Sequence, residues 1–235
     1  MAELLYEGKD KTSLQNRQGR WIFNFIIKND ATAGNGVKHD KFEGKGVLNN
    51  TISCIIFDML EEAGIKTHMI KKLNERDILV KKVDIFPLEV IIRNITTGSF
   101  CKRLGAPEGI VLDEPIFEMS YKNDEYGDPL INDDHAVALK LATREELAYI
   151  KETTLKINEL LKEFFLSMNL KLVDFKIEFG KTADGTILLA DEISPDSCRL
   201  WDVDTNQKYD KDVFRQDIGD LIETYKAVLA RMQNK

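Results

Sequence analysis

Residues 172–201 read LVDFKIEFGKTADGTILLADEISPDSCRLW and contain two strand-like runs on either side of Asp184-Gly185. An Asp-Gly pair between apolar runs is a strong signal for a two-residue hairpin. A turn centred on this pair places Glu178 directly opposite Asp191 on the neighbouring strand. The segment therefore predicts an antiparallel hairpin in which two carboxylates meet.

The face of the first strand that carries Glu178 is polar. Because side chains alternate along a strand, Asp174, Lys176 and Glu178 share one face. Opposed carboxylates repel each other by up to about 1 kcal/mol in a sheet, and a divalent cation relieves that repulsion. We therefore predict a magnesium site at Glu178 and Asp191. From this pattern alone, the alternative is a solvated polar face with both acids turned toward nearby lysines.

Composition limits the classes of protein to which the chain can belong. Its 235 residues, 43% of them hydrophobic, suffice for one large domain or two lobes. A net charge of −7 argues against a nucleic-acid partner. No apolar run approaches the roughly 20 residues that cross a membrane, and the N-terminus lacks a secretory signal. Three cysteines without C-x-x-C spacing indicate neither a disulfide framework nor a zinc site, so we expect a cytoplasmic protein.

The order of expected elements predicts the fold class. Apolar alternation predicts short strands at 4–7, 11–14, 21–27, 67–72, 78–83 and 88–93. Apolar stripes of helical period predict helices at 46–62, 99–104, 143–168 and 211–232, with an irregular polar segment at 106–134. Thr143 and Glu146 have the spacing of a capping box. The expected strands prevail early in the chain and the long helices late. This order indicates an α+β fold, with lobes at 1–84 and 85–235.

Two segments of the small lobe could contact a nucleotide. Gly8, Lys9 and Lys11 lie at a strand turn, where a glycine lets backbone amides approach a phosphate and lysines add charge. The turn lacks Walker A spacing, and a solvated charged turn is the alternative. The junction of the lobes could read an adenine edge or remain a solvated strand end; it consists of Lys81, Lys82, Val83 and Asp84.

Residues 89–99, EVIIRNITTGS, predict a phosphate site. Glu89 and Arg93 share one strand face, and Gly98-Ser99 opens a helix whose N-terminal amides favour an anion. Arg93 can add bidentate bonds. The alternative is a surface Arg–Glu pair beside an ordinary N-cap serine. Arg199 can add a further cation, so the sequence favours a pocket for a phosphate ester.

Several segments together resemble the SAICAR synthetase family, the phosphoribosylaminoimidazole-succinocarboxamide synthases. The matching segments extend over nearly the whole chain and are YEGKDKT, GKGVLNNTIS, LVKKVDIFPLEVIIRNITTGSFCKRLG, KNDEYGDPLIND, LVDFKIEFGKTADGTILLADEISPDSCRLWD and DVFRQDIGDLIETY. The last hairpin with SPDSCRLWD is the most specific of them. One departure is Asn35, where many members carry an acid.

The resemblance implies a reaction and an architecture. ATP, a phosphoribosyl-aminoimidazole carboxylate and L-aspartate would give the succinocarboxamide, ADP and phosphate. A small antiparallel sheet lobe would pack over a larger α+β lobe with ATP between them, and the protein would be a homodimer.

The resemblance also implies roles for individual residues. The catalytic group would be Lys176, Glu178 and Asp191, of which Glu178 and Asp191 hold magnesium. ATP would contact Gly8, Lys9, Lys11, Lys81, Lys82, Val83, Asp84 and Lys122. The ribotide would contact Glu89, Arg93, Gly98, Ser99, Asp128, Lys176, Asp196, Arg199 and Arg215.

The chemistry expected from these residues agrees with that reaction. A carboxylate is a poor electrophile, so forming an amide from it requires activation, and an acyl phosphate is our hypothesis for the intermediate. Phosphoryl transfer needs magnesium and cations around the spreading charge. The alternatives are a small-molecule kinase that uses the same cleft and an inert nucleotide-sensing module.

Overall fold

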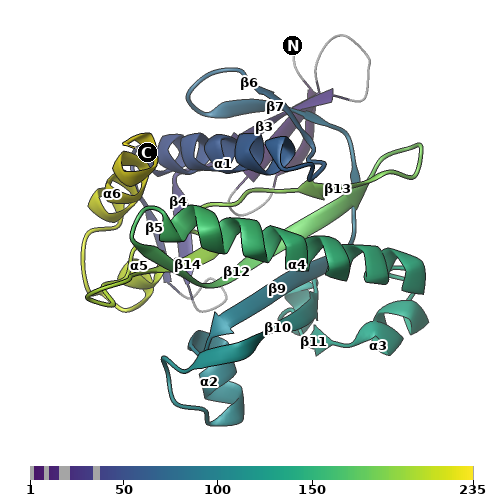
Figure 1. Ribbon diagram of the computed structural model, residues 1–235. Coiled ribbons are helices and arrows are strands. Elements are labelled where there is room, and N and C mark those ends of the chain that lie inside the picture. Colours follow the sequence, from purple (N-terminus) through teal and green to yellow (C-terminus); the bar gives the residue numbers. More distant parts are fainter. Residues whose placement is uncertain (1–2, 8–10, 16–21, 34–37, 235) are drawn as a thin grey trace.

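The computed structural model describes residues 3–7, 11–15, 22–33 and 38–234 (Figure 1). The first part of the chain holds β1 (Glu3–Glu7), β2 (Lys11–Gln15), β3 (Ile22–Ile27), β4 (Asp30–Ala33), β5 (Lys38–Lys41), α1 (Lys45–Glu62), β6 (Met69–Lys72), β7 (Asp77–Lys81) and β8 (Asp84–Ile85). The middle holds β9 (Leu88–Ile95), α2 (Gly98–Leu104), β10 (Val111–Tyr121), a 3₁₀ turn (Asp124–Tyr126), β11 (Leu130–Ile131), α3 (Asp133–Ala138) and α4 (Arg144–Leu166). The last part holds β12 (Leu170–Lys181), β13 (Ile187–Ala190), β14 (Cys198–Asp202), α5 (Asp212–Arg215) and α6 (Leu221–Gln233).

Two larger antiparallel sheets organise most of these elements, and β4 and β5 form a separate two-stranded sheet. The small sheet has the order β1-β2-β3-β7-β6, and α1 packs against it. The large sheet has the order β11-β10-β9-β12-β13, and β8 and β14 also pair with β12. Figure 1 shows α4 lying across the β9–β12 part of the large sheet and α6 beside α1. The predicted α+β fold with an antiparallel N-terminal sheet is confirmed.

The two sheets are joined by backbone hydrogen bonds as well as by the chain. The His68 amide donates to the Leu189 carbonyl (2.8 Å), and the Leu189 amide donates to the Lys66 carbonyl (3.0 Å). One continuous apolar core includes Ile27 of the small sheet and Phe175 of the large one. The side chains that line the junction are therefore held from both sides.

Long helices and the larger strands agree with the apolar periodicity. α4 begins after Thr143, whose hydroxyl accepts the Glu146 amide (3.2 Å) while the Glu146 carboxylate accepts the Thr143 amide (2.8 Å). This is the predicted capping box. Among the described helices, none combines the length and apolarity that crossing a bilayer requires. All three cysteines are free thiols.

The expectation of an irregular segment at 106–134 is wrong, because β10 occupies its centre. β10 pairs with β9, but the register shifts between Val111 and Ile116. Pro115 lies in that interval and lacks an amide donor, so the bulge accommodates it. Local sequence hides this strand because its pairing comes from β9, which lies at a distance in the chain.

The expectation of one last helix at 211–232 is also wrong. The chain forms α5 and then α6, because Asp217 adopts a left-handed conformation (φ 54°) between them. Asp220 starts α6 by accepting the Glu223 amide at 2.9 Å. Ile218, which the apolar stripe placed in the core, is 57% exposed.

Candidate active site

The turn between β12 and β13 has three residues instead of two. The Thr182 amide donates to the Thr186 carbonyl (2.9 Å), and the Asp184 carboxylate accepts the Thr186 amide (3.1 Å). Gly185 supplies the left-handed position that closes such a loop (φ 87°). Hydrogen bonds from the flanking threonines therefore extend the turn beyond the Asp-Gly pair.

This turn shifts the strand register by one residue. Glu178 pairs with Ala190, so the prediction that it directly faces Asp191 is wrong. In a regular strand, such a shift would turn Asp191 to the opposite face. β13 instead ends at Ala190, and Asp191 leaves the strand in a left-handed conformation (φ 65°).

Asp191 and Glu178 nevertheless act on the same cation. Burial lowers the pKa of the Lys176 ammonium, but the nearby carboxylates of Glu89, Glu178 and Asp191 outweigh burial and raise the pKa above its ordinary value. The two acids that the sequence selected therefore both lie near enough to this ammonium group to raise its pKa, although the hairpin register does not pair them.

These residues form the lysine–acid cluster, which comprises Glu89, Lys122, Lys176, Glu178 and Asp191. The Lys122 ammonium donates to both Glu178 oxygens, at 2.6 and 2.7 Å, and Lys176 pairs with Glu89. Glu178 is only 3% exposed. Clustered carboxylates that already hold cations fit a hard cation such as Mg²⁺, which takes one or two protein carboxylates and completes its shell with water and phosphate. Among the described residues, no group of three or more histidine, cysteine or acidic side chains is arranged to hold a metal ion.

A second set of charges lies along the large sheet and forms the ion-pair chain. Its members alternate in sign, and each touches the next: Arg103, Glu118, Arg93, Asp174, Arg199, Asp212 and Arg215. Asp174 accepts from Arg93 at 2.9 Å and from Arg199 at 2.8 Å through the same oxygen. Four arginines against three acids leave one positive charge in excess, which suits an anion.

Burial sets the electrostatics of this chain. It raises the pKa of Asp174 in spite of the two arginines beside it. It also acts to lower the pKa of Arg199, but Asp174 and Asp212 raise that pKa above its ordinary value. Arg199 and Arg215 hold the pKa of Asp212 below its usual range, even though burial opposes them. Arg199 is thus firmly charged, and the ion pairs fix the chain in place without a ligand.

The start of α2 lies against this chain. Arg93 donates to the Ser99 hydroxyl at 3.1 Å. Gly98 has φ 56°, and a side-chain carbon there would come within 2.6 Å of an Arg199 nitrogen. Only glycine allows this conformation and this approach together. The predicted grouping of Arg93, Gly98, Ser99 and Arg199 is therefore present in the structure.

Asp196 is held from another side. Its carboxylate pairs with Lys45 and accepts from Asn49 (3.0 Å) and from the Tyr225 hydroxyl (2.5 Å). Burial raises its pKa, but Lys211 and Lys45 bring the pKa down to about 2. Helices α1 and α6 thus meet at this carboxylate. Sequence reasoning missed Lys45, which is fully buried, because a lysine at the start of an amphipathic helix is ordinarily solvated.

The junction residues connect the small sheet to the large one. Lys81 ends β7, Asp84 begins β8, and Asp84 pairs with Lys181 of β12. The Val83 side chain packs on Gly180. This segment therefore connects the small sheet to the strand that carries Glu178.

The remaining predicted residues are placed as follows. Lys11 begins β2, opposite Ile27, and Arg215 ends the ion-pair chain. Asp128 accepts the Asn123 amide at 2.8 Å and closes the loop that follows Lys122. Gly8, Lys9 and Asn35 lie outside the described residues.

The functional residues that the sequence missed are partners of those it named. Glu118, Arg103 and Asp212 complete the ion-pair chain across long sequence separations. Asp174 could have been found from the sequence, because it alternates with Lys176 and Glu178 along one strand.

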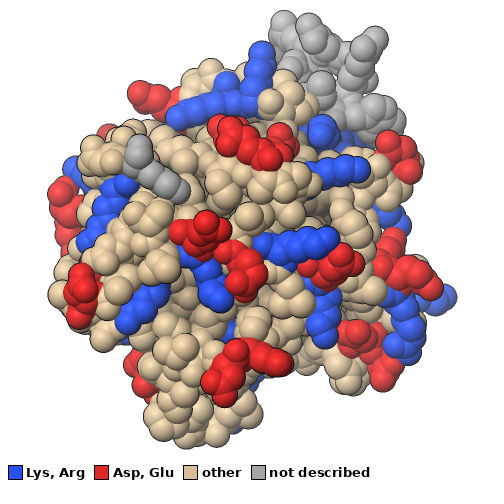
Figure 2. Space-filling model, viewed as in Figure 1, with Lys and Arg blue, Asp and Glu red and all other residues tan. Residues whose placement is uncertain are grey.

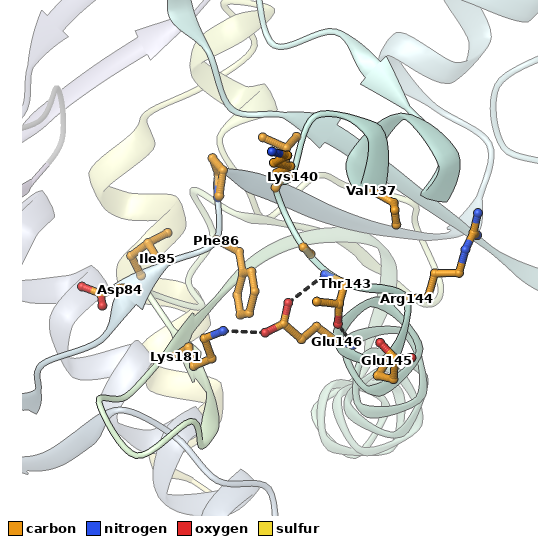
Figure 3. A pocket seen from close by; sticks show the side chains of 13 residues that line it. Asp84, Ile85, Phe86, Val137, Lys140, Thr143, Arg144, Glu145, Glu146 and Lys181 are labelled. Atoms are coloured by element: carbon orange, nitrogen blue, oxygen red, sulfur yellow. Dashed lines mark hydrogen bonds and ion pairs between the residues drawn. The ribbon is translucent and has the colours of Figure 1, made fainter.

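A hollow of about 670 Å³ lies beside the junction segment, between Asp84–Pro87 and the start of α4. Figure 3 shows the Phe86 ring pointing into it above the Lys181–Glu146 pair (2.6 Å). Glu146 also accepts the Thr143 amide, so both of its oxygens are engaged. Over the face seen in Figure 2, acidic and basic side chains are intermixed.

Fold and site together define an α+β protein whose strand β12 carries residues of both a chain of paired arginines and acids and a cluster of lysines and carboxylates. Such groups are typical of enzymes that act on phosphorylated substrates. The sequence profile of the SAICAR synthetase family matches residues 4–232. The chain therefore belongs to the SAICAR synthetase family.

Individual relatives match over their full length. The phosphoribosylaminoimidazole-succinocarboxamide synthase of Finegoldia magna is 62% identical over 98% of this chain and 99% of its own. That of Fusobacterium nucleatum is 56% identical over 99% and 98%. A solved structure of a type-2 SAICAR synthetase in complex with ADP superposes with a TM-score of 0.95, at 48% identity, over 99% of this chain and 98% of that one. The synthase of Ehrlichia chaffeensis gives 0.96 at 43% identity, over 98% of both chains.

Proposed function

We propose that this chain catalyses the reaction for which its relatives are named. It is an ATP-dependent carbon–nitrogen ligase of purine biosynthesis that joins phosphoribosyl-aminoimidazole carboxylate to L-aspartate. The products are the succinocarboxamide, ADP and phosphate. Full-length identity above one half and the ADP complex of a 48%-identical structure support this function.

One observation supports the proposal most directly. β12 places Asp174 of the ion-pair chain and Glu178 of the lysine–acid cluster on one strand, with Lys176 between them. Four residues of strand span about 13 Å, which is comparable to the length of a ribotide. One end of the strand can thus hold the substrate's phosphate while the other faces its carboxylate.

The ribotide phosphate binds Arg93, Arg199, Ser99 and the amide of Gly98. Arginine forks match phosphate oxygens bidentately, and the short helix α2 adds donors. Glu89 and Lys176 face the reacting end, and Asp128 and Arg215 lie at the edges. Asp196 supports the site from behind, because its oxygens are engaged by Lys45, Asn49 and Tyr225.

ATP binds between lobes formed by residues 1–84 and 85–235. Lys81, Lys82, Val83 and Asp84 meet the adenine, and Gly8, Lys9, Lys11 and Lys122 meet the phosphates. Magnesium, held by Glu178 and Asp191, would neutralise phosphate charge and polarise the transferred group. The enzyme works in the cytoplasm as a homodimer.

The chemistry proceeds through an acyl phosphate. A carboxylate oxygen of the ribotide attacks the γ-phosphorus and ADP leaves. The aspartate amine then attacks the acyl carbon, and phosphate leaves with the original carboxylate oxygen. This chain supplies cations and orientation for these steps and needs no protein nucleophile.

An absorbance assay with ATP, the carboxylated ribotide and L-aspartate, each omitted in turn, tests the function. Product should form only when all three are present. A stable phosphorylated product without aspartate would identify a kinase instead. With an ¹⁸O-labelled ribotide carboxylate, label should appear in the released phosphate, and its absence would exclude the acyl phosphate.

A further inference from the structure

The contact between Lys122 and Glu178 joins a fixed acid to a mobile cation. The ammonium lies 2.6 and 2.7 Å from the two Glu178 oxygens. The Glu178 side chain is 4% exposed, whereas that of Lys122 is 40% exposed. A flexible four-carbon stem that reaches the solvent lets the ammonium move, while the buried carboxylate stays in place.

The backbone of Lys122 is anchored beside the junction segment. Its amide donates to the Pro87 carbonyl at 3.0 Å, and the loop after it is closed by the Asn123–Asp128 hydrogen bond. β10 ends at Tyr121, directly before it. A change at Lys122 is therefore confined to its side chain, which lies between the junction segment and Glu178.

An ammonium and a divalent ion would compete for the two Glu178 oxygens in this geometry. Mg²⁺ binds carboxylate oxygens directly, at about 2.0–2.1 Å. The two charge-assisted hydrogen bonds of Lys122 occupy the same oxygens. The two cations would also repel each other, so that binding of one disfavours binding of the other.

The two lysines of the lysine–acid cluster are paired with different acids, Lys122 with Glu178 and Lys176 with Glu89. Departure of Lys122 would remove one positive charge from beside Glu178, which favours the entry of another cation. Lys176 stays, because it is paired with Glu89 and close to both Glu178 and Asp191.

We propose that Lys122 is the resident counter-ion of Glu178, which it releases to the metal as its own ammonium moves to the phosphates of the incoming nucleotide. This inference rests on the magnesium and ATP sites of the proposed function. It makes the free divalent ion a weak ligand of the empty enzyme. The metal then enters together with the nucleotide, since only the nucleotide offers Lys122 another anion.

Mn²⁺ titration followed by electron paramagnetic resonance, first without nucleotide, tests the exchange. Lys122→Met removes the competing ammonium, so Mn²⁺ should bind about tenfold more tightly than to the unmodified protein, the range of one charged hydrogen bond. Lys181→Met is the matched control. Lys181 is 44% exposed and contacts a Glu146 oxygen at 2.6 Å, away from the cluster, so its loss should leave Mn²⁺ affinity unchanged.

A second arm adds ADP. In the unmodified protein ADP should strengthen Mn²⁺ binding, and in Lys122→Met this enhancement should shrink, because coupling between two ligands is reciprocal. The metal-free variant should also melt at a lower temperature, and saturating Mn²⁺ should remove the difference. Lys122→Gln serves in the same way if the methionine variant does not fold.

Equal or weaker Mn²⁺ binding by Lys122→Met would overturn the exchange while leaving the metal site standing. If Mn²⁺ bound neither protein even with ADP, the metal site of the proposed function would fail, and the exchange with it. The two failures are therefore distinguishable.

Discussion

The ion-pair chain and the lysine–acid cluster lie along the same strand but hold their charges differently. In the ion-pair chain, the planar guanidinium forks of Arg93 and Arg199 are each locked between two acids, and Arg93 is 3% exposed. In the lysine–acid cluster, the head groups sit on flexible stems, with Lys176 and Lys122 39% and 40% exposed. Arginine suits fixed, bidentate recognition, whereas lysine acts as a movable point charge. The first region is built before any ligand arrives, and the second can rearrange.

The largest expected effect comes from a substitution in the lysine–acid cluster, the region that can rearrange. Asp191→Asn removes one of the two proposed magnesium ligands, and turnover should fall about a thousandfold, the scale of losing a major electrostatic contact. The fold should survive, because Asp191 is only half-buried and follows the end of β13. Steady-state rates over a magnesium series, with circular dichroism as the control for folding, measure this. Near-normal rates at limiting magnesium would show that the metal lies elsewhere.

The pH dependence of stability tests how rigidly the fixed region is built. Asp210 lies behind Arg199 and Asp212, and its oxygens accept the amides of Leu200 (2.9 Å) and Asp212 (2.7 Å). Burial and the neighbouring Asp212 raise its pKa from 3.8 to about 7. The folded state therefore keeps this proton up to about pH 7, while the unfolded chain loses it near pH 4.

Stability should consequently fall as pH rises from 4 to 7. Because the folded state holds one extra proton, the free energy of unfolding should fall by about 1.4 kcal/mol per pH unit. Over the whole window, the fall should be on the order of 4 kcal/mol. Urea unfolding of the unmodified protein and of Asp210→Asn across this range measures the difference. If the free energy of unfolding changed with pH in the same way for both proteins, Asp210 would be ionised in the folded state.

A smaller effect should distinguish arginine from lysine within the ion-pair chain. Arg93→Ala should weaken ribotide binding by about 2 kcal/mol, near thirtyfold, through loss of a charged partner. Arg93→Lys should restore little, because a single ammonium cannot reproduce the contacts with Glu118, Asp174 and Ser99. Calorimetric titration with the ribotide measures both variants.

Arg103→Lys is the matched control, since Arg103 reaches the ion-pair chain only through Glu118 and its side chain is 34% exposed. Its ribotide affinity should stay close to that of the unmodified protein. Full recovery by Arg93→Lys would show that the region recognises charge alone and is no more geometrically fixed than the lysine–acid cluster.

Much of this arrangement can be predicted from local sequence. Period-two alternation put Asp174, Lys176 and Glu178 on one face, and the capping signal placed the start of α4. These features depend on residues a few positions apart. Most of the helices and strands, and thus the α+β fold class, follow from the same local patterns.

The remainder depends on distant partners. β10 is stabilised by β9, and Asp174 meets Arg93 across 81 residues of sequence. The hairpin register depended on hydrogen bonds from Thr182 and Thr186 that compete with the two-residue turn. Asp191 reaches the cluster only through its left-handed backbone, which no periodicity reveals.

The smallest expected effect concerns the support of the two regions. The Tyr225 hydroxyl donates to Asp196 at 2.5 Å, and the ring is fully buried. Tyr225→Phe should lower the free energy of unfolding by about 1–2 kcal/mol, because Asp196 loses one of its partners but keeps Lys45 and Asn49. Ribotide affinity should stay nearly unchanged if Asp196 acts from behind the site. Urea unfolding and ribotide calorimetry on the same variant separate these outcomes. A large loss of affinity with unchanged stability would instead place the Asp196 carboxylate on the ribotide itself, as its position in the SPDSCR segment first suggested.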